Sequence, residues 1–146
     1  MIQSEVTALN HALEQTNEWM KDLQQRGDFL TQQQAYSHLR AVLHAVRDRL
    51  TVEEAVHFAA ELPMMVRGIY FEGWRPALAP NRDRETEDDF LAAVRESLRS
   101  PETPEQGDLR ERVRAVLALL TERMEEGQIR HAREQMPKEM QSIWPA

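Results

Sequence analysis

Apolar residues recur every three or four positions along most of the chain, which is the spacing of helices that bury one stripe of their surface. Residues 5–25 carry one such stripe, formed by Val6, Leu9, Leu13, Met20 and Leu23. A longer stripe occupies residues 35–50 and follows a capping signal made by Thr31 and Gln34. The spacing predicts two successive amphipathic helices, with Gly27 ending the first.

Two further signals divide the next part of the chain. Thr51 and Glu54 have the spacing of a capping box directly after the long stripe, so another helix is expected to begin there. Pro63 is tolerated in the first turn of a helix, because the amide hydrogen that proline lacks has no partner at that position. Residues 64–71 are therefore predicted to form a separate short helix after a bend.

The following stretch, residues 72–85, contains glycine, proline and charged residues without an apolar period, and is predicted to be a connector. Thr86 and Asp89 then have the spacing of a helix start, which predicts a helix over residues 87–99. A second irregular link precedes Asp108, where the same kind of capping signal predicts the start of another long helix.

The sequence resembles itself when residue 40 is placed on residue 114, a pairing that we call the repeat register. It aligns residues 40–70 with residues 114–144 without a gap and makes eight of the 31 positions identical. Ordinary residue frequencies would supply roughly two identities by chance. The identical pairs are Arg40/Arg114, Ala41/Ala115, Val42/Val116, Leu43/Leu117, Arg49/Arg123, His57/His131, Pro63/Pro137 and Ile69/Ile143. Both halves are therefore expected to follow the same path of helix, helix and short helix.

The predicted fold class is all-α, a helical bundle made of two tandem repeats with pseudo-two-fold symmetry. Residues 1–146 are expected to form a single helical domain, with repeat one at about 5–74, the connector at about 72–85 and repeat two at about 86–146. The first helix of each repeat is assigned by its order along the chain, because the two sequences align poorly there.

Composition and charge narrow the expected partners and location. The 25 acidic residues outnumber the 18 basic ones and give a formal net charge of -7, so neither nucleic acid nor a membrane is an expected partner. The start of the chain has no basic stretch leading into an apolar run. Cysteine is absent, which fits a reducing compartment. We expect a cytoplasmic protein.

Four segments together resemble a known family. They read LEQTNEW at residues 13–19, AYSHLRAVL at 35–43, ELPMMVRGIYFEGWRP at 61–76 and MPKEMQSIWP at 136–145. These segments look like the bacterial family named domain of unknown function 2267, and the resemblance spans nearly the whole chain. The resemblance implies an all-helical, duplicated, cytoplasmic protein of bacterial type. It implies no catalytic or binding residues.

His57 and His131 occupy equivalent positions of the two repeats. A pseudo-two-fold axis could bring them together as ligands to one metal or as a pH-sensitive contact. A zinc site needs three or four ligands, and the acidic residue Glu61, four positions after His57, has Gln135 as its counterpart. We therefore expect structural histidines, keep both as weak metal candidates, and assign no metal and no cofactor.

Arg49 and Arg123 are also repeated, each at the predicted end of a long helix. A cation there is stabilised by the helix dipole and by the last carbonyl groups, which explains both residues structurally. An anion-binding role is the alternative, although no glycine-rich segment accompanies either arginine to hold a phosphate.

The main candidate for an interaction surface is the corner formed by Arg67, Tyr70, Phe71, Trp74 and Arg75. Aromatic side chains beside arginines are typical of interaction hot spots. The structural alternative is that Tyr70 and Trp74 close the core. Phe71 and Trp74 have no aromatic counterpart in the second repeat, so they are the better candidates for a role beyond packing.

The expected function is that of a non-enzymatic protein-interaction or self-association module, with another protein or a second copy as partner. No catalytic constellation or cofactor fingerprint occurs in the sequence, and no Gly-x-Ser-x-Gly motif is present. The alternative is a small-ligand or metal-binding domain with its site between the two repeats. An enzyme with an unfamiliar acid/base pair is a third hypothesis that no residue supports.

Overall fold

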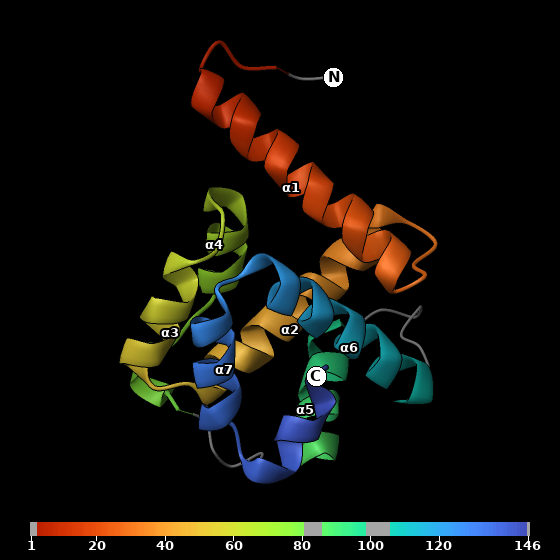
Figure 1. Cartoon of the computed structure of the whole chain (residues 1–146), viewed down its shortest axis with the longest axis vertical. Helices are drawn as coiled ribbons and strands as arrows, with labels where there is room; N and C mark the ends of the chain where they lie inside the picture. Colours follow the sequence, from red (N-terminus) through yellow and green to blue (C-terminus); the bar gives the residue numbers. More distant parts are fainter. Residues whose placement is uncertain (1–2, 81–85, 99–105, 146) are drawn as a thin grey trace.

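The computed structural model describes residues 3–80, 86–98 and 106–145, and the regular secondary structure of this part of the chain is helical throughout (Figure 1). It has no strand, which confirms the all-α fold class. Its elements are α1 (Thr7–Arg26), α2 (Gln32–Arg49), α3 (Val52–Ala60), α4 (Met64–Phe71), the 3-10 helix η1 (Pro76–Leu78), α5 (Glu87–Leu98), α6 (Gln106–Arg123), α7 (Glu126–Gln135) and the 3-10 helix η2 (Lys138–Ile143).

Most helix boundaries follow the capping signals in the sequence. Thr51 and Glu54 form the predicted reciprocal capping box at the start of α3. Helix α4 covers the predicted residues directly after Pro63. The predicted start at Asp108 is wrong, because α6 already begins at Gln106. Asp108 lies in the first turn instead, where its negative charge still favours the helix dipole.

Helices α2 and α6 contact each other at the centre of the bundle (Figure 1). Helix α1 packs against α2, α6 and α4, whereas α5 packs against α6, α2 and η2. Helix α3 packs against α7. The apolar core therefore lies between elements from both halves of the chain, and its fully buried members include Leu23, Leu39, Leu43, Phe58, Tyr70, Phe90, Leu109, Leu117 and Leu120.

Elements that correspond in the repeat register begin at matching positions. Helices α2 and α6 begin at Gln32 and Gln106, α3 and α7 at Val52 and Glu126, and α4 and η2 at Met64 and Lys138. Many side chains buried in the first set are also buried in the second, among them Ala35/Leu109, Leu39/Val113, Leu43/Leu117, Val46/Leu120, Leu50/Met124, Phe58/Ala132, Leu62/Met136 and Tyr70/Trp144. The segments α4 and η2 differ most in conformation, since the latter is a 3-10 helix.

Helix α1 extends past the rest of the bundle, and its N-terminal half projects beyond α4 (Figure 1). The apolar stripe of α1 continues into this half, where Val6 and Leu9 are exposed. Its C-terminal half is anchored by Trp19, Met20 and Leu23, which are buried. In the part of the chain that the structure describes, no helix is long and apolar enough to cross a membrane.

Candidate functional site

A polar cleft of about 560 Å³ lies between α2, α5 and the chain just after α4. Ionisable side chains dominate its lining on the α2 side, whereas the α5 side carries two small residues. The lining includes Arg40, His44, Arg47, Asp48, Arg49, Glu72, Gly73, Ala93, Glu96 and Ser97. The volume falls within the range of about 300 to 1,000 Å³ that is usual for small-ligand sites.

Two side chains of the cleft hold the C-terminal end of α4 on α2. Arg47 donates from Nη1 to the carbonyl oxygens of Tyr70 and Glu72, at 2.8 and 2.9 Å, and His44 donates from Nε2 to the Ile69 carbonyl at 2.7 Å. The last carbonyls of a helix have no partner within it, so these contacts satisfy them. Burial lowers the pKa of His44, and the charges of Arg47 and Arg40 act in the same direction.

Arg40 and Glu72 form an ion pair at the rim of the cleft. Arg40 donates from Nε and Nη2 to Oε1 of Glu72, at 2.7 and 2.6 Å. These hydrogen bonds hold the pKa of Glu72 below its ordinary value. The pair is largely solvent-exposed, so it contributes little to the stability of the fold.

Arg49 and Arg123, the repeated arginines, each lie over an aromatic ring of a neighbouring helix. The Arg49 guanidinium carbon is 5.0 Å from the centroid of the Phe90 ring in α5, and that of Arg123 is 5.7 Å from the Trp19 ring in α1. Arg49 is only 3% exposed and donates from Nη1 to the Ala45 carbonyl at 2.8 Å. Both arginines end their helices as predicted, and both also make cation–π contacts.

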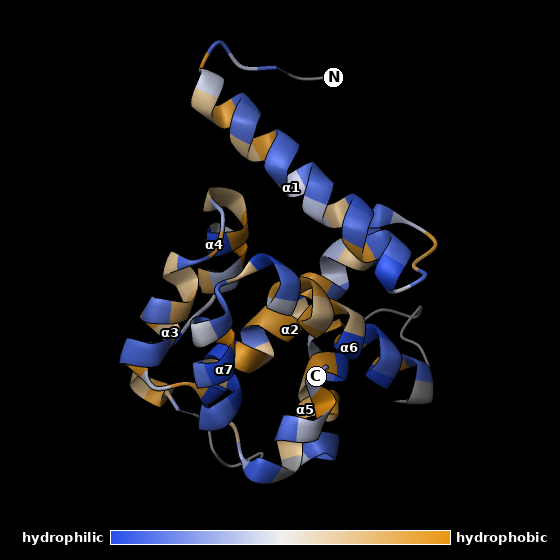
Figure 2. Ribbon diagram, in the orientation of Figure 1, coloured by the Kyte–Doolittle hydropathy of each residue, from blue (hydrophilic) through white to orange (hydrophobic). Residues whose placement is uncertain are grey.

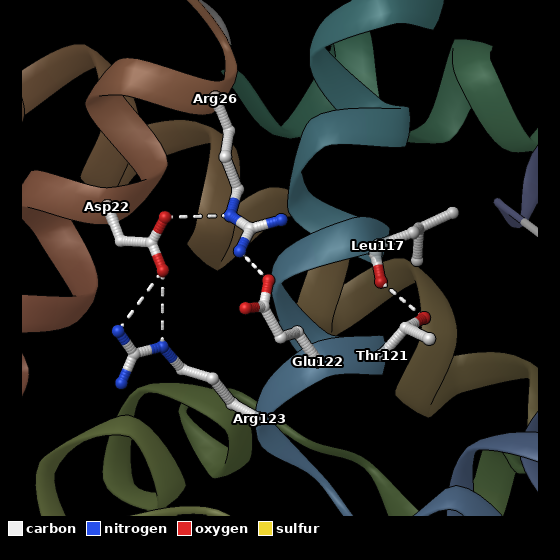
Figure 3. A network of polar contacts seen from close by, with 6 residues as sticks. All are labelled: Asp22, Arg26, Leu117, Thr121, Glu122 and Arg123. Carbon is white, nitrogen blue, oxygen red and sulfur yellow. Dashed lines mark hydrogen bonds and ion pairs between the residues drawn. The ribbon is translucent and has the colours of Figure 1, made fainter.

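A network of charged side chains lies between α1 and α6 (Figure 3). Oδ1 of Asp22 accepts from Nε of Arg26 at 2.7 Å, and Oδ2 accepts from Nη2 of Arg123 at 3.1 Å. Arg26 also pairs with Glu122. Burial alone would raise the pKa of Asp22, but the hydrogen bonds and charges of the two arginines outweigh it and hold this pKa below its ordinary value.

The predicted corner is partly buried. Tyr70 lies in the core, where its hydroxyl donates to the Ala55 carbonyl at 2.8 Å and burial raises its pKa, so its side chain is not part of the exposed surface. Phe71 and Trp74 are half-buried against the core, with ring centroids 5.4 Å apart. Arg67 donates to the Ala59 carbonyl near the end of α3 at 3.0 Å and to the Leu62 carbonyl just after that helix at 2.8 Å. Arg75 is exposed beside a smaller cavity of about 110 Å³.

The paired histidines lie on α3 and α7, which pack against each other. His131 is exposed, and its Nε2 is 3.4 Å from Oε2 of Glu54 on α3. His57 is exposed on the same helix as Glu54. Among the residues in the described ranges, no group of three or more histidine, cysteine, aspartate or glutamate side chains is arranged to hold a metal ion.

The model of one protein family, described as an uncharacterized conserved protein (DUF2267), matches residues 16–143. This chain belongs to that family. The match covers most of the chain and confirms the resemblance carried by the four sequence segments. No curated protein matches the chain.

This DUF2267 chain exposes four large apolar side chains on α3 and α4, which we call the apolar set: Val52, Val56, Met64 and Met65, between 40 and 58% exposed. Their counterparts in the repeat register are all charged, namely Glu126, Arg130, Lys138 and Glu139. Figure 2 shows the same contrast, because α7 is mostly hydrophilic in colour whereas α4 is more hydrophobic.

Sequence reasoning missed the polar residues of α2 in this DUF2267 chain. Arg40, His44 and Arg47 follow a spacing of four and three, which places them on one face of a helix. That second, polar stripe was a usable signal for a polar contact or cleft beside α2. The element that this stripe contacts could not be predicted, because its hydrogen-bond partners at the end of α4 are backbone carbonyls, which every residue has.

Proposed function

We propose that the fold is a tandem duplication in which two copies of one helical unit pack against each other around a pseudo-two-fold axis. The matching helix starts and the paired buried positions support this proposal. The pattern of contacts supports it independently. Helix α1 packs on α2, α6 and α4, and α5 packs on α6, α2 and η2, so α1 and α5 contact corresponding elements of the two halves. On this proposal, repeat one covers about 5–74 and repeat two about 86–146.

The function that the geometry supports best is that of a non-enzymatic protein-interaction module, cytoplasmic as expected from the sequence, that binds through the apolar set of α3 and α4. One observation carries this proposal: each exposed apolar residue of the set has a charged counterpart in the other half. The fold itself therefore does not require an apolar side chain at these positions. Exposed apolar groups that the fold does not require are typical of binding surfaces.

A second copy of the chain is the partner that this surface fits first. Exposed acidic and basic side chains lie next to the apolar set in the sequence: Glu53 and Glu61 are acidic, and His57 and Arg67 are basic. A two-fold contact places the same patch on both copies, so acidic groups of one copy can meet basic groups of the other. Because only the first half carries the apolar set, such a contact closes as a dimer. The exposed Val6 and Leu9 of α1 would enlarge it toward the roughly 800 Å² per partner that stable interfaces bury.

The double variant Val56→Arg with Met64→Lys tests this function, since it gives the first half the residues of the second. The fold should tolerate the change because Arg130 is exposed at the equivalent position of α7. Sedimentation velocity and native mass spectrometry over a concentration series should show a dimer for the wild type. The variant should shift the dissociation constant upward by about 100-fold, as expected when charges replace two buried apolar contacts.

The reciprocal variant Arg130→Val is the matched control and should leave self-association unchanged. A wild-type chain that stays monomeric at all concentrations would exclude the second copy as partner. The interaction function as a whole is excluded if the wild type is monomeric and, in addition, the wild type and the double variant retain the same bound proteins when purified from their source. Circular dichroism of each variant shows that any loss is not caused by unfolding.

The cleft beside α2 favours a second candidate function, that of a small-ligand-binding domain. It lies between helix α2 of the first half and helix α5 of the second, away from His57 and His131, and it has the volume of such a site. A ligand held there would bridge the two halves and should raise the unfolding temperature progressively as its free concentration exceeds the dissociation constant.

A further inference from the structure

The methionines of this chain divide into two groups by exposure. Among the described residues, Met64 and Met65 at the start of α4 are 58 and 40% exposed, and we call them the methionine pair. The others are buried and at most 6% exposed, namely Met20, Met124, Met136 and Met140. An oxidant dissolved in water therefore reaches the thioethers of the pair directly, whereas it reaches the buried ones only when the core opens.

The composition and the fold both favour the methionine pair as the target of a two-electron oxidant. Cysteine is absent, so no thiol of the chain competes with the thioether groups for peroxide. Neither Met64 nor Met65 belongs to the apolar core, and their counterparts in the repeat register are Lys138 and Glu139. On the proposed duplication, the fold accommodates polar side chains at these positions, so a polar oxidation product is compatible with a folded chain.

The methionine pair supplies two of the four side chains of the apolar set, together with Val52 and Val56 of α3. A flexible thioether adapts its shape to an apolar partner, and methionine is for this reason frequent at binding surfaces. Its sulfoxide has a polar oxygen that accepts hydrogen bonds from water, and burying that oxygen against apolar side chains costs free energy. One chemical change at the pair therefore alters the surface that is proposed for self-association.

We propose that Met64 and Met65 form an oxidation site through which hydrogen peroxide controls self-association. A sulfur lone pair attacks one oxygen of the peroxide, so that an S–O bond forms and the O–O bond breaks. The proton of the transferred oxygen goes to the departing oxygen, which leaves as water. Each sulfur is oxidised by two electrons to the sulfoxide, and the peroxide is reduced. The effect on association rests on the proposed function, whereas the position of the site does not.

Oxidation at the methionine pair is reversible and is coupled to association in both directions. A methionine sulfoxide reductase restores each thioether with two thiols, which become a disulfide while the oxygen leaves as water. In the dimer, the second copy covers the methionine pair and protects it from the oxidant. The oxidised chain in turn pairs poorly and accumulates as a monomer. Oxidation should therefore be slower at chain concentrations at which the dimer prevails.

Peptide mapping by mass spectrometry, after treatment of the folded full chain with hydrogen peroxide for increasing times, tests the position of the site. Residues 50–67 form one tryptic peptide whose only methionines are the methionine pair. This peptide should be oxidised at least about tenfold faster than the peptides that contain Met124, Met136 and Met140. In concentrated urea, where the core is open, the rates should become similar. Equal rates in the folded chain would overturn the assignment of the site.

Sedimentation velocity over a concentration series, before and after oxidation, tests the effect on association. Oxidation of the methionine pair should raise the dissociation constant of the wild-type dimer at least about tenfold. The sulfur-free variant Met64→Leu with Met65→Leu keeps apolar side chains at the site, so its association should persist after the same treatment. The polar variant Met64→Gln with Met65→Gln should weaken association without any oxidant. Circular dichroism checks that each chain stays folded.

The outcomes separate the control by peroxide from the proposed function. A wild-type chain that is monomeric before oxidation excludes self-association and overturns the control by peroxide with it. A dimer that survives complete oxidation of the methionine pair overturns the control alone and leaves self-association in place. Dissociation of the sulfur-free variant under the same treatment would also overturn the control, because the effect would then come from other residues. Treatment of the oxidised wild type with a methionine sulfoxide reductase and dithiothreitol should restore the dimer.

Discussion

The guanidinium carbon of Arg49 lies 5.0 Å from the centroid of the Phe90 ring, which joins the end of α2 to α5. The Arg49 side chain is almost completely removed from solvent, whereas that of Arg123, at the same position in α6, is 32% exposed. Burial makes the loss of such a side chain more costly, because both its packed stem and its hydrogen bonds contribute.

Arg49→Ala should therefore destabilise the fold more than Arg123→Ala. We expect a loss of about 2 to 4 kcal/mol in the free energy of unfolding for the first variant and about 1 kcal/mol for the second. Urea unfolding followed by circular dichroism measures both. Equal losses would mean that the burial of Arg49 adds nothing to its contribution.

Arg47→Met should loosen the C-terminal end of α4. The variant keeps the apolar stem but leaves the carbonyls of Tyr70 and Glu72 without the donor that Arg47 provides, at a cost of about 2 to 3 kcal/mol. Hydrogen exchange should accelerate at the amides of α4 before it does so elsewhere. The counterpart Thr121 bonds to Leu117 in its own helix at 2.7 Å, so Thr121→Val is the matched control and should leave exchange in η2 unchanged.

Local signals in the sequence were sufficient for the helices but not for the surface. The capping box at Thr51 and the bend at Pro63 act over a single helical turn, so their consequences could be predicted directly. Whether Tyr70 faces solvent or the core depends instead on packing between α3 and α4. Its neighbour Phe71 keeps partial exposure, although the two share the same aromatic composition signal.

The cleft could not be predicted from either half alone. Its lining comes from α2, from the segment after α4 and from α5, which are far apart in the sequence. The sequences of α1 and α5 share too little to align, although Arg49 and Arg123 make similar contacts with rings of α5 and α1. Histidines at repeated positions are easy to recognise in the sequence, but His57 and His131 both lie exposed.

The buried leucines Leu43 and Leu117 provide a direct test of the proposed duplication. Both are completely buried, and they correspond in the repeat register of the two central helices. Leu43→Ala and Leu117→Ala should each reduce the free energy of unfolding by about 2.5 to 5 kcal/mol. Urea unfolding should give losses that agree within about 1 kcal/mol if the two sites have similar surroundings. A large difference between the two would argue against equivalent cores.

The stability of the fold should fall as the pH is lowered from about 7.5 to about 5, because burial makes two histidines resist protonation. Burial lowers the pKa of His38, and it also lowers the pKa of His44, both from an ordinary value of 6.5. The unfolded chain then binds protons at a higher pH than the folded chain does. The stabilising contribution is complete above the ordinary pKa and is lost as the pH falls toward the folded pKa.

Thermal unfolding at several pH values between about 5 and 8 measures this dependence. The carboxylates with lowered pKa values, Asp22 and Glu72, remain ionised throughout that range, so these two groups contribute little to the change. His38→Gln and His44→Gln should each flatten the profile, and the second variant still offers a donor for the Ile69 carbonyl. An unfolding temperature that rises on acidification would show that these histidines are stabilised in their charged form.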